Sequence, residues 1–322
     1  MTDATIQRAG PPPRVTIVMA TWNWSEVLPF SIGSALLQTF TDFELLVVGD
    51  GCTDNSAEVV AAIADPRVRW INLPANSGHQ SGPNNEGLRQ ARGELVAYLG
   101  HDDLWLPHHL ACLVQAIDAG ADLVYGMVRF VTPCQDGGGF FIRPDYRSGD
   151  WLPPTCVTHR RALAVQAGGW PNYRTLRCDP ETELWRRFHE AGAHIGFVPR
   201  LTAIKLPAAE RRNVYRERPC HEQAAWLERI RSSDVEREEL AAGLIAVDTR
   251  LNDYRGLLRE VVRRGTSALI ARLRALRRPR AGEALEQRQR FKGVDRRAGR
   301  VNGRPKRGSP QSRNKVDDQG RG

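Results

Sequence analysis

Four short polar clusters in this sequence each follow closely on a run of apolar residues. They are Thr21-Trp22-Asn23, Gly49-Asp50-Gly51, Asn76-Ser77-Gly78 and Gly100-His101-Asp102-Asp103. If the apolar runs are parallel strands, the carboxyl ends of those strands meet along one edge of a sheet, where α/β proteins bind their ligands. Loops after buried strands are often polar in any case, so the chemistry of each cluster carries the argument. The spacing predicts one binding site to which all four clusters contribute.

Asp50 ends a continuous apolar run and is followed by Gly51. A carboxylate accepts hydrogen bonds, and uracil, thymine and guanine each present a ring N–H on their pairing edge, whereas adenine and cytosine present an acceptor there. An aspartate that contacts the base therefore favours a uridine, thymidine or guanosine nucleotide. The alternative is a turn aspartate that bonds only its own loop.

Asp102 and Asp103 form a carboxylate pair after the fourth apolar run. Such a pair suits a hard divalent cation, Mg²⁺ or Mn²⁺, that also binds a diphosphate. A cation in this position would neutralise a leaving nucleoside diphosphate. The alternative is that both acids cap the segment that follows them. His101 is either a further ligand or a hydrogen-bonding neighbour.

Three carboxylates, Asp179, Glu181 and Glu183, lie within five residues around Pro180. Asp179 can cap a helix that has Pro180 at its first position. Glu181 then falls in the first turn, where a carboxylate facing the binding edge could act as general base on an acceptor hydroxyl. The alternative is that all three acids merely favour the amino-terminal end of that helix.

Alternating strand and helix patterns predict the scaffold that holds these residues. Strands are expected at 15–20, 43–48, 68–73, 94–99 and 122–125, with helices at 26–38, 54–63, 82–92 and 107–119 between them. Strands alternating with helices of about ten residues indicate βαβ units and a mainly parallel sheet with helices on both faces. The fold class expected is α/β, of the Rossmann-like kind.

The pattern changes after residue 126. Helices are expected at 160–167 and 181–191 and a final strand at 195–198, with a proline-containing loop over 151–159. We therefore predict a flexible lead-in at 1–13 and one domain at 14–205, with a nucleotide-binding half at 14–125 and an acceptor half at 126–205. A helical region at 206–276 and a disordered basic tail at 277–322 follow.

Charge is spread unevenly along the 322 residues. Residues 277–322 carry 15 basic and 5 acidic residues, whereas the remainder carries 31 basic and 32 acidic residues. The tail has few apolar residues, which predicts disorder. Only Phe291 interleaves its arginines, so a specific nucleic-acid partner is not expected. With no apolar run of membrane-spanning length and no secretory signal pattern, we expect a cytoplasmic protein.

Residues 257–276 have the pattern of a basic amphipathic helix. Apolar residues recur there at three- and four-residue steps, and five arginines mostly occupy the remaining positions. Such a helix can lie in the interface of an anionic membrane. This predicts weak peripheral contact with the inner face of the membrane. The alternative is that the helix packs on the domain or on a second subunit.

In order and spacing, the motifs resemble those of family 2 of the inverting glycosyltransferases, which have the GT-A fold. The resemblance covers about residues 14–205. It rests on the four clusters above, on Asn85-Glu86-Gly87 before Gly93-Glu94, on Gly168-Gly169-Trp170, and on the acidic cluster before Leu184-Trp185. Three positions depart from the family pattern. Gly100 replaces the first aspartate of the metal motif, Asn84 stands where many relatives have arginine, and Pro180-Glu181 replaces a Glu-Asp pair.

The resemblance implies transfer of a sugar, with inversion, from a nucleoside-diphosphate sugar to a hydroxyl of a glycan or lipid-linked acceptor, as in synthesis of cell-envelope polysaccharides. It implies a divalent metal (Mn or Mg) on Asp102 and Asp103. Glu181 takes the place of the base, with Asp179 and Glu183 as alternatives, and Trp151, His159 and Trp170 lie on the acceptor side. The donor-binding residues are Thr21, Asn23, Asp50, Asn76, Gly78, Asn84 and Asp102.

Two other functions compete with sugar transfer. A dinucleotide-dependent dehydrogenase needs the G-x-G-x-x-G turn after its first strand, and this chain has Thr21-Trp22-Asn23-Trp24 there, which excludes that class. A relative of the same fold that binds nucleotide without catalysis remains the alternative, because Gly100 interrupts the metal motif.

Overall fold

Three buried apolar runs and one half-buried run form the four parallel strands of the amino-terminal half. The structure is a computed structural model, and it describes residues 10–133, 138–252 and 292. β1 (Val15–Thr21) pairs with both β2 (Phe43–Gly49) and β4 (Leu95–Tyr98), and β3 (Val68–Asn72) pairs with β2. β2 is buried along its whole length, which agrees with its nearly unbroken apolar sequence.

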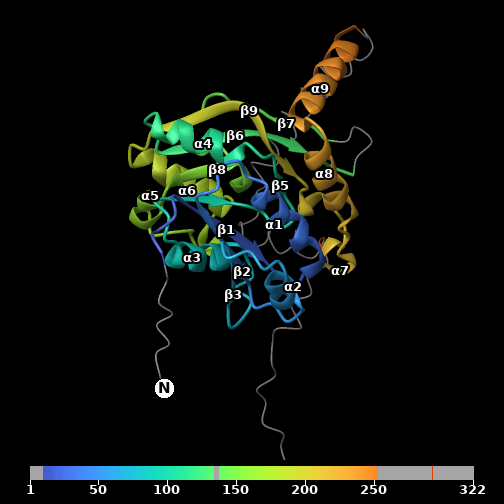
Figure 1. Cartoon of the computed structure of the whole chain (residues 1–322). Helices are drawn as coiled ribbons and strands as arrows, with labels where there is room; N and C mark the ends of the chain where they lie inside the picture. Colours follow the sequence, from blue (N-terminus) through green and yellow to red (C-terminus); the bar gives the residue numbers. More distant parts are fainter. Residues whose placement is uncertain (1–9, 134–137, 253–291, 293–322) are drawn as a thin grey trace, which may run out of the picture.

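Helices connect these strands and cover the sheet (Figure 1). After a short 3-10 turn at Ser25–Val27, α1 (Leu28–Leu36) leads to β2, and α2 (Ser56–Ala62) leads to β3. α3 (Ser81–Gln90) packs on β1 and β2, and α4 (His109–Asp118) packs on β6 (Leu123–Phe130) and β9 (Ile195–Lys205). The expected βαβ alternation and the mainly parallel α/β fold are thus confirmed.

The carboxyl-terminal half completes the sheet with antiparallel pairings. In the described part of the chain the strand order is β3-β2-β1-β4-β8-β6-β9-β5, with β7 (Phe140–Phe141) beside β6. β8 (Val157–Arg160) is antiparallel to both of its neighbours, β4 and β6. β5 (Leu104–Trp105) pairs antiparallel with the end of β9. α5 (Arg161–Gln166) and α6 (Pro180–Glu190) follow β8 in sequence.

Two sequence expectations are corrected here. The loop expected at 151–159 ends in β8, which lies in the middle of the sheet, after a 3-10 turn at Pro154–Cys156. The strand expected at 195–198 continues to Lys205, and its pairing with β6 is irregular around Pro199 and Arg200. Proline has no N–H to donate to a neighbouring strand, so a proline in the sequence predicts that a strand ends there. Here the strand continues beyond it through an irregularity in the pairing.

The region expected as a separate helical part returns to the sheet. Its described helices are α7 (Val214–Glu217), α8 (His221–Ser232) and α9 (Val235–Asn252), with a 3-10 turn at Ala208–Glu210 before them. Ala208 and Val214 pack with Trp24 and Val27 near the end of β1, and α8 packs on α1. In Figure 1, α9 extends away from the sheet. Residues 206–232 therefore form one wall of the domain.

Several sequence expectations fall outside the described residues. These are residues 1–9 of the lead-in expected at 1–13, the amphipathic helix expected at 257–276, and the basic tail, of which only Lys292 is described. Among the helices that are described, none is long and apolar enough to cross a membrane.

Candidate active site

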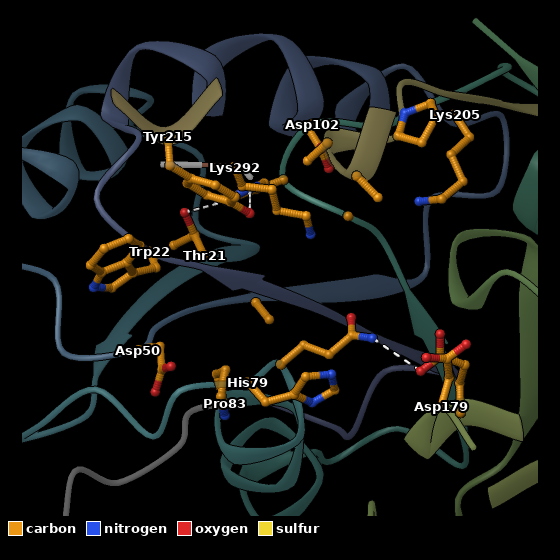
Figure 2. A pocket seen from close by; sticks show the side chains of 18 of the residues that line it. Thr21, Trp22, Asp50, His79, Pro83, Asp102, Asp179, Lys205, Tyr215 and Lys292 are labelled. Carbon is orange, nitrogen blue, oxygen red and sulfur yellow. Dashed lines mark hydrogen bonds between the residues drawn. The ribbon is translucent and has the colours of Figure 1, made fainter. Parts of the chain in front are cut away.

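A cavity of about 710 Å³ opens at the carboxyl ends of the parallel strands. All four predicted clusters contribute to its lining, through Thr21, Asp50, Asn76, Gly78 and the segment Gly100–Asp102. Acids of the α6 region line it as well, so the sheet edge and the start of α6 face one space (Figure 2). The structure thus brings the four clusters together around one cavity, and its use as a binding site stays a prediction.

Asp50 lies where β2 ends, and its side chain is only slightly exposed. Its Oδ1 accepts a hydrogen bond from the backbone N–H of Ser77 at 2.8 Å, and its Oδ2 accepts one from Gly78 at 3.3 Å. Asn76 donates from Nδ2 to the Asp50 carbonyl at 3.1 Å. Burial raises the pKa of Asp50, and the bonds from Ser77 and Gly78 partly offset this effect. Asp50 therefore both fixes its loop and lines the cavity, so neither sequence interpretation excludes the other.

His101 forms the centre of a hydrogen-bonded chain on the opposite wall. Its Nδ1 lies 2.8 Å from the Thr21 hydroxyl and its Nε2 lies 3.3 Å from the Tyr215 hydroxyl. Burial lowers the pKa of His101, which favours the neutral ring. The Trp22 ring lies 5.9 Å from the Tyr215 ring, between centroids. Both ring nitrogens of His101 thus contact hydroxyl groups in this arrangement, as expected of a hydrogen-bonding neighbour.

Asp103 is fully buried, and both of its carboxylate oxygens are engaged. Oδ2 accepts from the Lys205 ammonium at 2.8 Å, and Oδ1 accepts from the backbone N–H of Leu206 at 3.1 Å. A Cβ on Gly100 would lie 2.6 Å from Asp103 Oδ2. The aspartate that the family pattern has at position 100 would therefore collide with this arrangement of Asp103.

The predicted metal motif does not fit a cation held by several protein ligands. Lys205 and the Leu206 N–H occupy both oxygens of Asp103, so in this arrangement neither oxygen is available to a cation. Asp102 lines the cavity and is the remaining carboxylate of the motif. Within the described ranges there is no group of three or more His, Cys, Asp or Glu side chains that could hold a metal ion.

Glu181 lies in the first turn of α6 and reaches the cavity. Its Oε1 accepts a hydrogen bond from Trp151 Nε1 at 3.0 Å, and its Oε2 accepts one from Gln80 Nε2 at 3.3 Å. Burial raises the pKa of Glu181, and the neighbouring Asp179 carboxylate raises it further, while the Trp151 N–H lowers it. A carboxylate with a raised pKa that faces a substrate cavity has the properties of a general base.

The two alternatives to Glu181 differ in position. Asp179, labelled in Figure 2, lines the cavity, as Glu181 does. Glu183 instead pairs with Arg186 at 2.7 Å and with Arg187 at 2.9 Å, and it does not line the cavity. The structure thus removes Glu183 from the candidate bases and keeps Asp179.

Two of the three residues predicted on the acceptor side do not line the cavity. His159 is fully buried in β8, where Nε2 contacts the Tyr98 hydroxyl at 3.2 Å and Nδ1 contacts the Arg160 carbonyl at 2.8 Å. Trp170 is buried too, and its carbonyl accepts from Asn85 Nδ2 at 2.9 Å. His159 is buried because β8 is a strand inside the sheet and not a loop. Trp151, the third, does line the cavity.

Two predicted donor-binding residues lie outside the cavity lining. Asn23 accepts at Oδ1 from the backbone N–H of Thr53 at 2.7 Å, and it thereby joins the loops after β1 and β2. Asn84 is buried in α3. Neither is among the lining residues. Asn23 joins two loops in this arrangement, and donor contact by Asn23 or Asn84 stays a prediction.

Sequence reasoning missed several lining residues. They are His79, Gln80, Pro83, Phe130, Lys205, Pro207–Glu210, Tyr215 and Lys292. Lys205 is the last residue of β9, so the strand-end rule would have found it had the length of β9 been recognised. Tyr215 donates its backbone N–H to the carbonyl of Lys292 at 3.0 Å, a pairing for which the sequence holds no signal.

Comparisons with known proteins agree with this geometry. Residues 16–162 match the family model described as glycosyl transferase family 2. The succinoglycan biosynthesis protein ExoO of Rhizobium meliloti is 40% identical over 107 residues, which cover 33% of this chain and 30% of that protein. The Escherichia coli UDP-Glc:alpha-D-GlcNAc-diphosphoundecaprenol beta-1,3-glucosyltransferase WfgD is 33% identical over 96 residues, covering 30% of this chain and 38% of that one.

A solved structure extends the likeness in fold. The crystal structure of S. aureus TarS 1-349 superposes with a TM-score of 0.53 at 20% identity, covering 61% of each chain. The matched segments span about a third of the length of the curated relatives named above. Residues 16–162 of this chain therefore belong to glycosyl transferase family 2, and the fold around them is of the GT-A type.

Proposed function

We propose that this protein transfers a sugar from a nucleoside-diphosphate sugar, preferably a uridine nucleotide, to a hydroxyl of the acceptor. The observation that carries the proposal is that Asp50 and Glu181 line one cavity. Figure 2 shows Asp50 at one end of this cavity and Asp179, two residues before Glu181, at the other. A donor that spans this cavity has its base near Asp50 and its anomeric carbon near Glu181. Thymidine and guanosine donors offer the same ring N–H to Asp50.

The names of the relatives support this choice of donor and indicate the class of acceptor. WfgD is named for UDP-Glc, and a second relative, from Campylobacter jejuni, is a GalNAc(5)-diNAcBac-PP-undecaprenol beta-1,3-glucosyltransferase. Both names specify acceptors linked to undecaprenol through a diphosphate. We therefore propose a glycan acceptor carried on such a lipid, in the synthesis of a cell-envelope polysaccharide.

The proposed reaction is a single displacement with inversion. Glu181 takes the proton of the acceptor hydroxyl, and the acceptor oxygen forms a bond to the anomeric carbon. The bond from that carbon to the diphosphate oxygen breaks on the opposite face, and the nucleoside diphosphate leaves with the electron pair. Trp151 and Gln80 hold the two oxygens of Glu181 and so orient the base. The expected divalent cation (Mn or Mg) retains only Asp102 of its predicted ligands, so no step is assigned to it.

Purified full-length protein tested against UDP-, dTDP- and GDP-sugars decides this proposal. We expect UDP to raise the melting temperature most, and UDP-sugars to be hydrolysed slowly in the absence of acceptor. If nucleotide stabilises the protein but no donor is hydrolysed and no sugar is transferred, the alternative is favoured, namely a protein of the same fold that binds nucleotide without catalysis.

The pH dependence of transfer is expected to report the environment of Glu181. Activity requires the charged carboxylate, so the rate falls as the pH drops through the raised pKa of Glu181. Trp151→Phe removes an N–H that stabilises the charged form, and it should move the acidic limb of the kcat profile to higher pH. Asp179→Asn removes a neighbouring negative charge and should move that limb to lower pH. A limb that stays in place in both variants would show that another group titrates.

Weak peripheral membrane binding fits a lipid-linked acceptor, and we propose that residues after 256 provide it. The basis is the basic amphipathic pattern at 257–276 and the basic tail. Each basic residue near an anionic surface contributes about 1 kcal/mol. Full-length protein should co-sediment with anionic vesicles at low salt more than a 1–256 truncation does, and high salt should abolish the difference. Equal sedimentation of the two proteins would contradict membrane binding by these residues and favour packing on the domain or on a second subunit.

A further inference from the structure

A lysine ammonium, Lys205, lies where a divalent cation was expected. Lys205 is the last residue of β9, and its Nζ lies 2.8 Å from Asp103 Oδ2. Its side chain keeps 19% of its surface exposed and is among the residues that line the cavity. The adjoining N–H of Leu206 binds the other oxygen of Asp103 at 3.1 Å. Asp103 is thereby held by the end of β9 and in turn fixes the position of the ammonium.

The charges around Lys205 keep it protonated. Burial alone would lower the pKa of Lys205, but the carboxylates of Asp103, Asp102 and Glu181 act against burial and leave the pKa raised. Three N–H donors belong to a lysine ammonium, and Asp103 accepts one of them. The remaining donors can bind oxygens of a ligand in the cavity.

The position of Lys205 also suits a diphosphate. Figure 2 shows Asp50 at one end of the cavity and Lys205 and Asp179 toward the other, with Asp102 between them along the upper wall. A nucleotide whose base contacts Asp50 must extend its phosphates away from that end, toward Lys205. The sugar to be transferred then lies between these phosphates and Glu181.

We propose that Lys205 binds the donor's diphosphate and neutralises the charge that develops on it as the nucleoside diphosphate leaves, so that the donor binds without a divalent metal. This inference rests on the proposed function and deepens it. Gly100 is part of the same arrangement, since a side chain there would displace Asp103 from its contact with Lys205. A preorganised positive group aimed at a leaving phosphate stabilises the transition state in the same electrostatic way as a metal ion.

A second ammonium must be distinguished from Lys205. Among the described residues that line the cavity, Lys292 is the other lysine, and its Nζ lies 6.0 Å from the centroid of the Tyr215 ring. Its charge lowers the pKa of His79, secondary to burial. Lys292 therefore lies closer to the aromatic wall, whereas Lys205 lies beside the carboxylates at the reacting end.

The test compares the affinities of UDP and uridine, both in EDTA. Uridine lacks the phosphates, so the ratio of the two affinities measures how strongly the protein binds the diphosphate. Removing Lys205 alone would leave Asp103 buried and unpaired, which destabilises the fold. The informative pair is therefore Asp103→Asn, which keeps the ammonium, and Lys205→Met combined with Asp103→Asn, which removes both charges. Thermal melting verifies that both variants are folded, and Lys292→Met serves as the matched control.

Wild type and Asp103→Asn are expected to bind UDP more tightly than uridine in EDTA. The double variant should lose about tenfold to a hundredfold in UDP affinity, the effect of removing a charge-assisted hydrogen bond to phosphate, with uridine affinity unchanged. Equal UDP affinity in Asp103→Asn and the double variant would overturn the proposal. It would also be overturned if wild type bound UDP no more tightly than uridine in EDTA, or if only Lys292→Met lost the preference for UDP over uridine. If wild type binds no nucleotide with or without metal, the proposed function itself fails.

Discussion

Glu181→Gln is expected to lower the rate of sugar transfer by about 10²–10⁴-fold, the usual effect of removing a general base, while UDP affinity stays close to that of wild type. Glutamine has nearly the same shape as glutamate, and its amide oxygen can still accept the Trp151 N–H that now binds Glu181 Oε1. It cannot take a proton from an acceptor hydroxyl. Transfer to an acceptor, measured beside calorimetric UDP binding, separates the two effects.

The neighbouring acids provide matched controls for this result. Glu183→Gln changes a carboxylate on the same helix that pairs with Arg186 and Arg187 outside the cavity, so it should leave transfer nearly unchanged. Asp179→Asn changes a carboxylate that lines the cavity without a position in the proposed proton transfer. A larger loss of rate in either control than in Glu181→Gln would contradict the assignment of the base.

The strand-end rule explains why much of the site was predictable. Continuous apolar runs identify buried parallel strands, and the polar residues that follow them must meet at one edge. Asp50, Asn76, Gly78 and Asp102 were found in this way, and each lines the cavity. Glu181 was found because a proline and a capping residue locate the start of α6. These signals are local in sequence, so one chain is enough to detect them.

Features that depend on tertiary pairing were not predictable in the same way. β8 has only four residues, and its place between β4 and β6 follows from pairing with distant segments, so His159 was assigned to a loop. Because of Pro199, the strand predicted from the sequence ends at residue 198, so the second half of β9, with Lys205 at its end, was not predicted. Asp103 has the residue type of a metal ligand, and only the position of Lys205 shows that it bonds an ammonium instead.

Asp50→Asn is expected to weaken UDP binding by about tenfold or more and to reduce the preference for UDP over CDP. In uracil the ring N3 carries a hydrogen that a carboxylate can accept, whereas in cytosine the same nitrogen is an acceptor. Asparagine presents an NH₂ group that can donate to cytosine N3. Losing a charge-assisted bond to a partly desolvated base costs about 1.5–3 kcal/mol, which corresponds to about tenfold to a hundredfold in affinity. Calorimetry with both nucleotides measures this change in preference.

The control for Asp50→Asn must separate reading of the base from support of the loop, because Asp50 also accepts N–H bonds from Ser77 and Gly78. Asn76→Ala removes a bond to the Asp50 carbonyl and leaves its carboxylate in place. It should therefore weaken UDP and CDP binding by similar factors, if at all. If Asp50→Asn also weakens both nucleotides equally, then Asp50 acts only by holding the loop after β3. The preference among nucleotides would then arise elsewhere in the cavity, with the Trp22 and Tyr215 rings as the next residues to vary.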